Sequence, residues 1–110
     1  MPKDHPRVVA YGEADGLNAV LGLAATACNG GELGLVLEEL QHQAFRLGAD
    51  LATPPGSPHE DKVRRISGED VSVLERQIDA IDGANDELKC FVLPGGCELA
   101  ARLHMARDAA

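Results

Sequence analysis

Apolar residues recur along this chain at steps of three and four, which is the period of an α-helix with one buried face. The pattern predicts four helices, over about residues 6–29, 32–52, 67–82 and 97–110, with a solvent loop over 53–66. Short connections between four helices are typical of an antiparallel bundle. We therefore predict an all-α fold, with residues 1–110 forming a single helical-bundle domain.

Each predicted helix has one apolar stripe that we expect to face the core. The four stripes are Tyr11, Ala14, Leu17, Leu21, Ala24, Ala25 and Cys28; Leu33, Val36, Leu37, Leu40, Ala44, Leu47 and Leu51; Val71, Leu74, Ile78 and Ile81; and Leu99, Leu103 and Ala106. Ser67 is a suitable N-cap for the third helix, and Asp70 stands where a capping box has its acid. Gly12, Gly16 and Gly22 each cost about 1 kcal/mol in a helix interior, so we expect close backbone approach along the first helix.

Composition narrows the range of partners. The chain has 18 acidic and 10 basic residues, and its net charge of -8 disfavours nucleic acids and anionic membrane surfaces. No apolar run reaches the roughly 20 residues that span a bilayer. The predicted solvent loop contains the basic cluster of Lys62, Arg64 and Arg65, and the acid pairs at 38/39 and 69/70 are interpreted as solvated helix faces.

The cysteines and histidines do not indicate a metal centre or a disulfide framework. Cys28, Cys90 and Cys97 are odd in number and include no Cys-x-x-Cys, which favours reduced thiols in a cytoplasmic protein. Glu39 and His42 have the Glu-x-x-His spacing of di-iron bundles, but a di-iron site needs a second copy and two further glutamates. We therefore expect no metal bound by protein ligands.

Several short motifs occur in an order that indicates a family. They are KDHPRV (3–8), AYGEADGLN (10–18), LEELQ (37–41), LGADLATP (47–54), RIS (65–67), LE (74–75), FVLPGG (91–96) and LHMAR (103–107). Together they resemble the ATP:corrinoid adenosyltransferases over nearly the whole chain. Each motif is weak alone, and the specificity comes from their order and spacing.

The resemblance implies a ferritin-like bundle of five helices, of which four are present here, assembled as a homotrimer with active sites between subunits. The implied reaction transfers the 5′-deoxyadenosyl group from ATP, accompanied by Mg²⁺, to the cobalt of cob(I)alamin or a related corrinoid. Cob(I)alamin is itself the nucleophile. The protein must therefore hold C5′ of ATP near the cobalt, neutralise the departing triphosphate and exclude water.

The resemblance also implies roles for individual residues. Phe91 matches the aromatic that faces the corrinoid and helps to displace its lower axial ligand. Arg107 matches an arginine that pairs across the subunit interface with the aspartate of the first helix, here Asp15. Lys3 matches a lysine that contacts ATP phosphate, and Asn18 matches a polar position near the ATP or the corrinoid.

The chain departs from the family pattern at both ends. It starts after the Gly- and Thr-rich loop that wraps the triphosphate and stops three residues beyond Arg107, and Gly16 replaces an acid. We expect an incomplete form of the enzyme with little or no activity as 110 residues. The alternatives are a non-catalytic corrinoid-binding module and a helical oligomerisation domain. The recurrent histidine, His104, has no assigned role.

Overall fold

The computed structural model describes residues 5–28, 30–83 and 95–110, and every regular element in these ranges is helical. The elements are α1 (Pro6–Thr26), α2 (Gly31–Ala52), the 3₁₀ turn η1 (Glu60–Lys62), α3 (Gly68–Asp82) and α4 (Glu98–Ala109). The all-α prediction is confirmed. The loop expected over 53–66 contains η1, and α1 ends at Thr26, earlier than the sequence pattern indicates.

The early end of α1 has a local cause. The N–H of Ala27 donates to the carbonyl of Ala24 at 3.1 Å, which tightens the last turn from the α to the 3₁₀ pattern. Gly30 and Gly31 follow with φ of 83° and 74°, a backbone region that other residues rarely adopt. The chain therefore reverses between α1 and α2 over a few residues.

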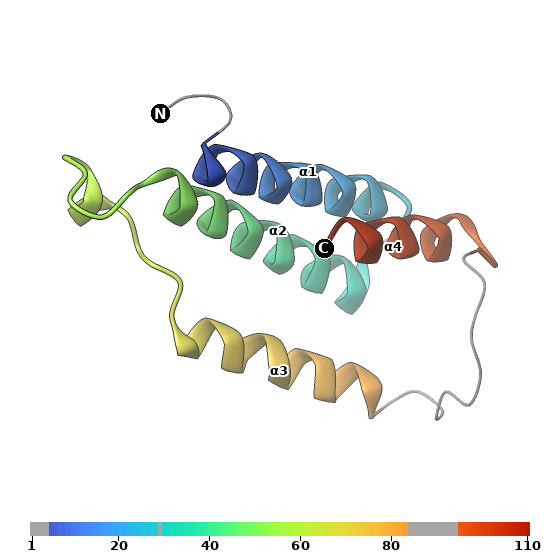
Figure 1. The fold of residues 1–110 in the computed structure, drawn as a ribbon. Helices are drawn as coiled ribbons and strands as arrows, with labels where there is room; N and C mark the ends of the chain where they lie inside the picture. Colours follow the sequence, from blue (N-terminus) through green and yellow to red (C-terminus); the bar gives the residue numbers. More distant parts are fainter. Residues whose placement is uncertain (1–4, 29, 84–94) are drawn as a thin grey trace.

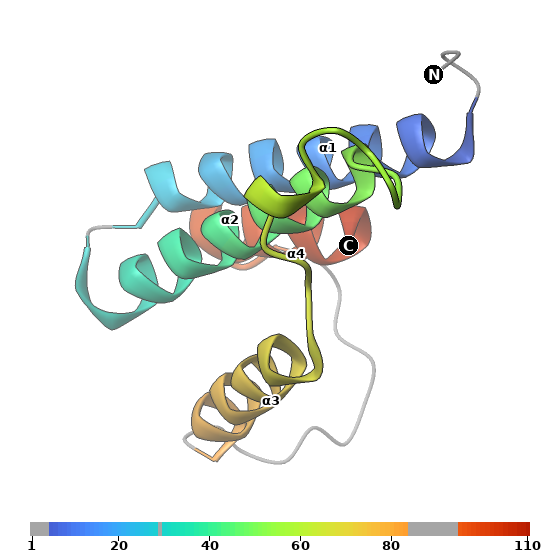
Figure 2. The ribbon, with the colours of Figure 1, turned by 90° about the vertical axis from the view of Figure 1, so that its left-hand side faces the viewer.

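Three helices form the packed part of the molecule. α1 lies against both α2 and α4, whereas α3 stands apart from them (Figures 1 and 2). The buried residues of this core are Leu21, Ala24, Leu37, Ala44 and Ala106. Leu37 is only 2% exposed and is the largest fully buried side chain.

The C-terminal end of α1 is capped by a residue from α4. α1 has no basic residue in its last turn, although a cation there would favour the helix dipole. Arg102 supplies one, donating from Nη1 to the carbonyl of Leu23 at 2.8 Å and to the hydroxyl of Thr26. Glu98 holds the same guanidinium from one turn earlier on α4. These contacts fix the start of α4 against the end of α1.

The C-terminal end of α2 is capped in the same way, by arginines outside that helix. Arg65 donates to the carbonyls of Asp50 at 3.0 Å and Thr53 at 2.6 Å, and Arg7 donates to the carbonyl of Leu51 at 3.1 Å. The start of α1 and the loop after α2 therefore meet at this end of α2.

Arg65, which the sequence pattern places in a solvent loop, is also the centre of an ion-pair network. Its guanidinium lies 2.7 Å from the Asp50 carboxylate and 3.2 Å from that of Glu60. The N–H of Ile66 donates to Asp50 at 2.8 Å, and this bond, with Arg65, lowers the pKa of Asp50. The N–H of Gly56 and Arg65 lower the pKa of Glu60. The carboxylates in turn raise the pKa of Arg65, with Asp50 the larger contributor.

The start of α3 is fixed by Asp70. The N–H of Ser67 donates to Asp70 Oδ2 at 2.8 Å, as the expected capping box requires. Arg46 on α2 contacts both carboxylate oxygens of Asp70, at 2.9 and 3.1 Å. The Ser67 N–H and then Arg46 lower the pKa of Asp70. Asp70 is 9% exposed, so its interpretation as a solvated acid is wrong: the carboxylate ties α3 to α2.

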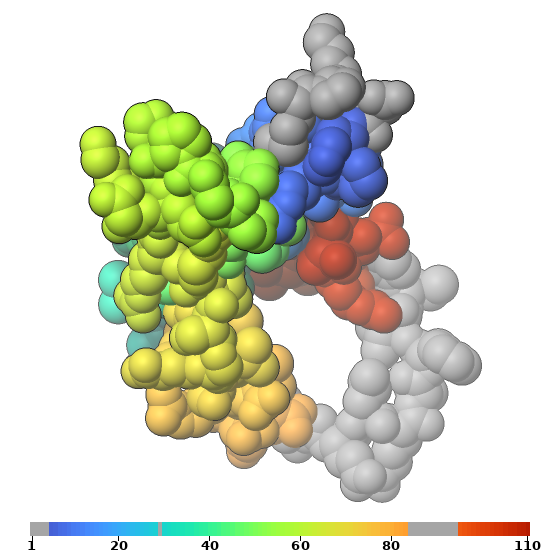
Figure 3. Space-filling view, turned by 60° about the vertical axis from the view of Figure 1, so that its left-hand side comes forward, coloured from blue at the N-terminus to red at the C-terminus, as the bar shows by residue number. Residues whose placement is uncertain are grey.

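The apolar stripe predicted to bury α3 is largely exposed within the described residues, so that prediction is also wrong. Val71, Ile78 and Ile81 are 49%, 62% and 46% exposed. The reason is that α3 touches α2 through the Arg46–Asp70 ion pair at its start, whereas its backbone makes no close approach to α1, α2 or α4. The space-filling view shows a wide opening between α3 and α4 (Figure 3).

Within the described ranges, none of the helices combines the length and the apolar character needed to cross a membrane.

Candidate functional site

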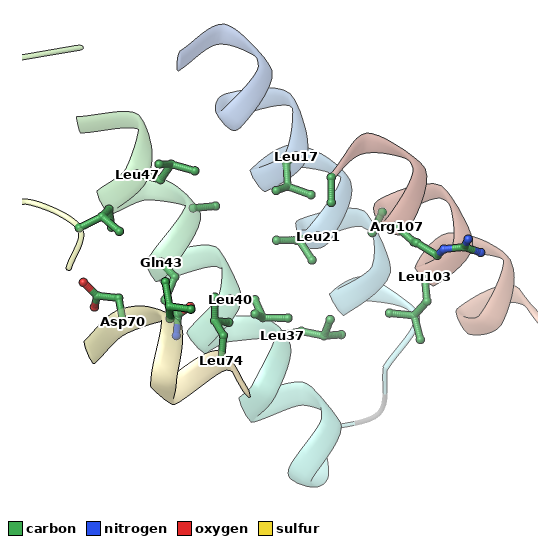
Figure 4. A pocket seen from close by; sticks show the side chains of 15 residues that line it. Leu17, Leu21, Leu37, Leu40, Gln43, Leu47, Asp70, Leu74, Leu103 and Arg107 are labelled. Carbon is green, nitrogen blue, oxygen red and sulfur yellow. The ribbon is translucent and has the colours of Figure 1, made fainter. Parts of the chain in front are cut away.

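Two hollows of similar size compete as the functional site. The first, which we call the apolar groove, has a volume of about 400 Å³ and is enclosed mainly by leucines from α1, α2, α3 and α4 (Figure 4). Its polar lining is limited to Gln43, Asp70 and Arg107. Asp70 is already paired with Arg46, and Figure 4 shows the guanidinium of Arg107 directed away from the leucines. These walls suit an apolar helix face better than a nucleotide.

The second hollow lies between α1 and α2, and we call it the Asp15 groove. Its volume is about 410 Å³, and it is lined by Tyr11, Gly12, Asp15, Asn18, Ala44, Phe45, Gly48, Ala49 and Ala52. This groove combines an acid, an amide and two aromatic rings with a floor of small residues. Of the two hollows, it has the chemistry for polar recognition.

Helical periodicity explains how these residues come together. Residues three and four apart share one face of a helix, which places Tyr11, Asp15 and Asn18 in a row along α1. Phe45 and Gly48 follow the same spacing along α2. The two rows form the walls of the groove because α1 packs directly on α2.

Asn18 has an unsatisfied acceptor in this wall. Its backbone carbonyl accepts from Nε2 of Gln41 on α2 at 3.4 Å. Its side-chain Oδ1 is buried and has no hydrogen-bond partner within the described residues. An unpaired buried carbonyl is costly, so this oxygen is a candidate for contact with a bound group.

Asp15 and Arg107 are exposed and lie on different helices, α1 and α4. Neither takes part in an ion pair within residues 5–28, 30–83 and 95–110. The structure of one chain therefore does not bring them together.

Two of the predicted site residues, Lys3 and Phe91, lie outside the described residues. The glycines that follow Phe91 are partly described: Gly95 and Gly96 have φ of 138° and 94°. At such angles a side chain would strain the backbone. The chain thus enters α4 through a backbone conformation at Gly95 and Gly96 that suits glycine.

His104 lines a further hollow of about 520 Å³ along α4, together with Ala101, Met105, Arg107 and Asp108. No group of three or more His, Cys, Asp or Glu in the described part of the chain is arranged to hold a metal ion. Glu39 instead accepts from Gln43, and His42 lies 3.9 Å from Glu38.

Phe45 is a groove residue that sequence reasoning missed. It lies off the apolar stripe of α2 and is 70% exposed. A signal was available, because the chain has only three aromatic residues, one Tyr and two Phe, and an aromatic off the stripe cannot be filling the core. Tyr11, which was assigned to the core face of α1, is 37% exposed and lines the groove.

The chain is similar to named corrinoid adenosyltransferases. It is 45% identical over 108 residues to corrinoid adenosyltransferase PduO of Salmonella typhimurium, covering 98% of this chain and 32% of that protein. It is 41% identical over 109 residues to the corrinoid adenosyltransferase of Bacillus subtilis, covering 96% of this chain and 54% of that protein. The chain thus spans between about a third and about half of the length of these relatives.

Solved structures of corrinoid adenosyltransferases are also similar to this chain. A variant of the PduO-type ATP:corrinoid adenosyltransferase of Lactobacillus reuteri, complexed with cobalamin and ATP, superposes with a TM-score of 0.83 at 35% identity. The match covers 99% of this chain and 61% of that one. A second variant, complexed with ATP, matches with the same TM-score at 37% identity. The model of the cobalamin adenosyltransferase family matches residues 1–110, and the chain belongs to that family.

Proposed function

We propose that this protein transfers the 5′-deoxyadenosyl group of ATP to the cobalt of a reduced corrinoid, forming adenosylcobalamin and triphosphate. The observation that carries the proposal is the likeness, over almost the whole chain, to an adenosyltransferase complexed with both cobalamin and ATP. In the reaction cob(I)alamin attacks C5′, the C5′–O bond breaks, and the triphosphate leaves with the bonding electrons.

We propose further that the protein acts as a homotrimer, with Asp15 of one subunit paired with Arg107 of the next. Two features of the single chain support this arrangement. Both side chains are exposed, and neither has an ionic partner among the described residues. A pair between subunits would leave each chain, taken alone, in this state.

The remaining roles follow the family pattern. Phe91 would face the corrinoid, and the bend at Gly95 and Gly96 would direct it. Lys3 would contact the ATP phosphates. The unpaired Oδ1 of Asn18 supports a contact with substrate, because a donor on the substrate would satisfy an acceptor that is otherwise buried alone.

Mg²⁺ would enter with the nucleotide. Since the described residues offer no group of three metal-ligating side chains, the triphosphate oxygens would supply most of its ligands. Cys28 and Cys97 are free thiols, which supports the cytoplasm as the proposed location.

The apolar groove and the exposed stripe of α3 support the five-helix form of the bundle. One further amphipathic helix lying in this groove would cover the leucines of α2 and the apolar side chains of α3 together.

The proposed function is tested by titrating the 110-residue chain with cob(II)alamin and ATP and recording electron paramagnetic resonance spectra. A four-coordinate cob(II)alamin signal that requires ATP would support adenosyl transfer. Binding without that signal would identify a corrinoid-holding module, and absence of binding an oligomerisation domain. Spectra are the primary readout, because we expect slow turnover from this chain.

The subunit pair is tested by charge reversal. Asp15→Arg and Arg107→Asp should each weaken the ATP-dependent signal by at least about tenfold, because each puts two like charges together. The double variant restores opposite charges and should recover much of the signal. Two single variants without effect, or a double variant no better than either, would contradict the pairing.

A further inference from the structure

Two kinds of contact hold α4 on the rest of the molecule. α4 starts near the end of α1 and runs back along it (Figure 1). Its apolar contacts with the core come from the later turns, where Ala106 is 5% exposed and Leu103 is packed against the same core. Within the described part of the chain, no residue of the first turn, 98–101, belongs to that core. The first turn therefore needs another means of attachment.

Arg102 provides this attachment. Its Nη1 donates to the Leu23 carbonyl at 2.8 Å and to the Thr26 hydroxyl, and its Nη2 pairs with the Glu98 carboxylate. The Thr26 hydroxyl itself donates to the Leu23 carbonyl at 2.6 Å, so the two acceptors on α1 are bonded to each other. A guanidinium is planar and holds its donors in a rigid fork. These contacts therefore fix the orientation of the first turn as well as its distance from α1.

The bend that enters α4 has little support of its own among the described residues. Gly95 and Gly96 have positive φ, and a Cβ built on either would meet nothing within 4 Å. Cys97 follows as the extended N-cap of α4, and its Sγ accepts from the Ala100 N–H at 3.4 Å. Cys97 is thus bonded to α4 itself. The direction of the bend consequently depends on where the first turn of α4 is held.

We propose that Arg102 is a positioning residue for the corrinoid. By fixing the first turn of α4 on α1, it sets the direction in which the chain leaves the bend toward Phe91, which stands four positions before Gly95 in the sequence. The inference rests on the proposed function, which places Phe91 against the corrinoid. Arg102 acts through the bend and not by contact with substrate, since its guanidinium is taken up by α1 and Glu98.

The Arg102 contacts should matter more for position than for stability. The Arg102 side chain is 26% exposed and that of Glu98 is 69% exposed, and an exposed ion pair contributes little to the free energy of unfolding. By contrast, a misplacement of about 1 Å caused far from the reacting atoms can cost about a hundredfold in rate. Removing Arg102 should therefore impair the corrinoid chemistry of a chain that stays folded.

The first test is Arg102→Ala, with Arg76→Ala as the matched control, because Arg76 is an exposed arginine of α3. In the titration with cob(II)alamin and ATP, Arg102→Ala should lower the four-coordinate share of the cob(II)alamin by about tenfold. The ATP concentration at half-maximal signal should not change. Arg102→Lys keeps the charge without the fork and should give an intermediate share. Arg76→Ala should match wild type in both measurements.

The second test follows the Phe91 segment without any ligand. In a background with the native cysteines changed to serine, where Cys97→Ser keeps an N-cap, nitroxides are attached at Ala19→Cys on α1 and at Phe91→Cys. Labelled protein is diluted with unlabelled protein, and pulsed electron paramagnetic resonance gives the distances between the labels. Arg102→Ala should broaden these distances. The distances from Ala19→Cys to Asp108→Cys should keep their width, because the later turns of α4 stay packed.

The outcomes separate this inference from the proposed function. Unchanged distances between the labels at 19 and 91 would overturn the role of Arg102 whatever the spectra show. So would broadening at both label pairs, or a four-coordinate share for Arg102→Ala equal to that of wild type. A wild-type chain without any four-coordinate signal would defeat the proposed function, and the distances alone would then decide whether Arg102 sets the direction of the bend.

Discussion

The packed helices α1, α2 and α4 and the separate helix α3 are held in place by different interactions. α1, α2 and α4 share a core of alanine and leucine side chains, whereas α3 is attached through the ionic contacts of Asp70 and through the anchored loop before it. α3 has an apolar stripe of its own, but its isoleucines are about half exposed. Apolar periodicity therefore shows which face of a helix can be buried. Charged contacts can fix the position of a helix even when that face stays exposed.

The largest expected effect is a loss of stability in the packed helices α1, α2 and α4. Leu37→Ala removes the one large side chain that is fully buried among the described residues and should lower the free energy of unfolding by about 2–5 kcal/mol. Urea denaturation followed by circular dichroism measures it. Leu35→Ala, a matched change at an exposed position of α2, should stay within about 0.5 kcal/mol of wild type. Equal losses for both variants would show that this core does not hold the helices together.

The next largest effect is expected when the ion pair that attaches α3 to α2 is removed. Arg46→Ala leaves the Asp70 carboxylate without its closest cation, so amide hydrogen exchange should become several-fold faster across α3 and change little in α1. Arg64→Ala is the control, because Arg64 is 69% exposed and lies 3.9 Å from the same carboxylate, and such an exposed pair contributes little. Uniform acceleration across all helices would show that α3 and the core open as one unit.

Acid should release α3 without any substitution. The pKa of Asp70 in the folded chain is below its ordinary value of 3.8, so the unfolded chain binds the proton more readily and unfolding is favoured as pH falls. The stabilisation is therefore complete well above pH 3.8 and is lost as the pH falls from about that value through the lower folded pKa.

Hydrogen exchange of α3 between pH 6 and pH 3, corrected for intrinsic rates, measures this loss. Asp70→Asn should start with weaker protection and show a flatter pH dependence. Asp50 has a lowered pKa as well, so the loop before α3 should lose protection over a similar range. Protection that rises on acidification would contradict the assignment.

The smallest expected effect is a gain in the stability of the packed helices, with no change in α3. Gly16 lies inside α1, and a Cβ there would meet nothing within 4 Å. Gly16→Ala should therefore stabilise the chain by about 0.5–1 kcal/mol through helix propensity. Gly31→Ala is the opposing control and should destabilise, because Gly31 has a φ of 74°. Thermal unfolding of the two variants measures both signs.

Local features of the fold could be predicted from the sequence, and distant pairings could not. The helix periodicity and the Ser67–Asp70 cap depend on residues a few positions apart. The partner of Asp70 on α2 is 24 positions away in sequence, and that of Arg65 on α2 is 15 away. A charge on a polar helix face or in a loop gives the same pattern whether it is solvated or paired, so the sequence shows neither the partner of Asp70 nor that of Arg65.

The candidate site likewise contains residues that the sequence predicts and residues that only the structure shows. Resemblance to the family named Asp15 and Asn18, and their spacing on one helix brings them to one face. The other wall of the groove comes from α2, and only the packing of α1 on α2 shows that Phe45 faces them. The expected burial of the α3 stripe failed because periodicity cannot say whether a partner for that stripe is present.

The contact of Arg102 with the end of α1 has a consequence for how the chain folds. The donor and the carbonyl it caps are 79 positions apart, so the last turn of α1 gains this cap only after nearly the whole sequence has been brought together. Closing so long a loop carries an entropic cost that nearer contacts avoid. The final turn of α1 and the first turn of α4 should therefore gain and lose their order together, as one cooperative unit at that end of the molecule.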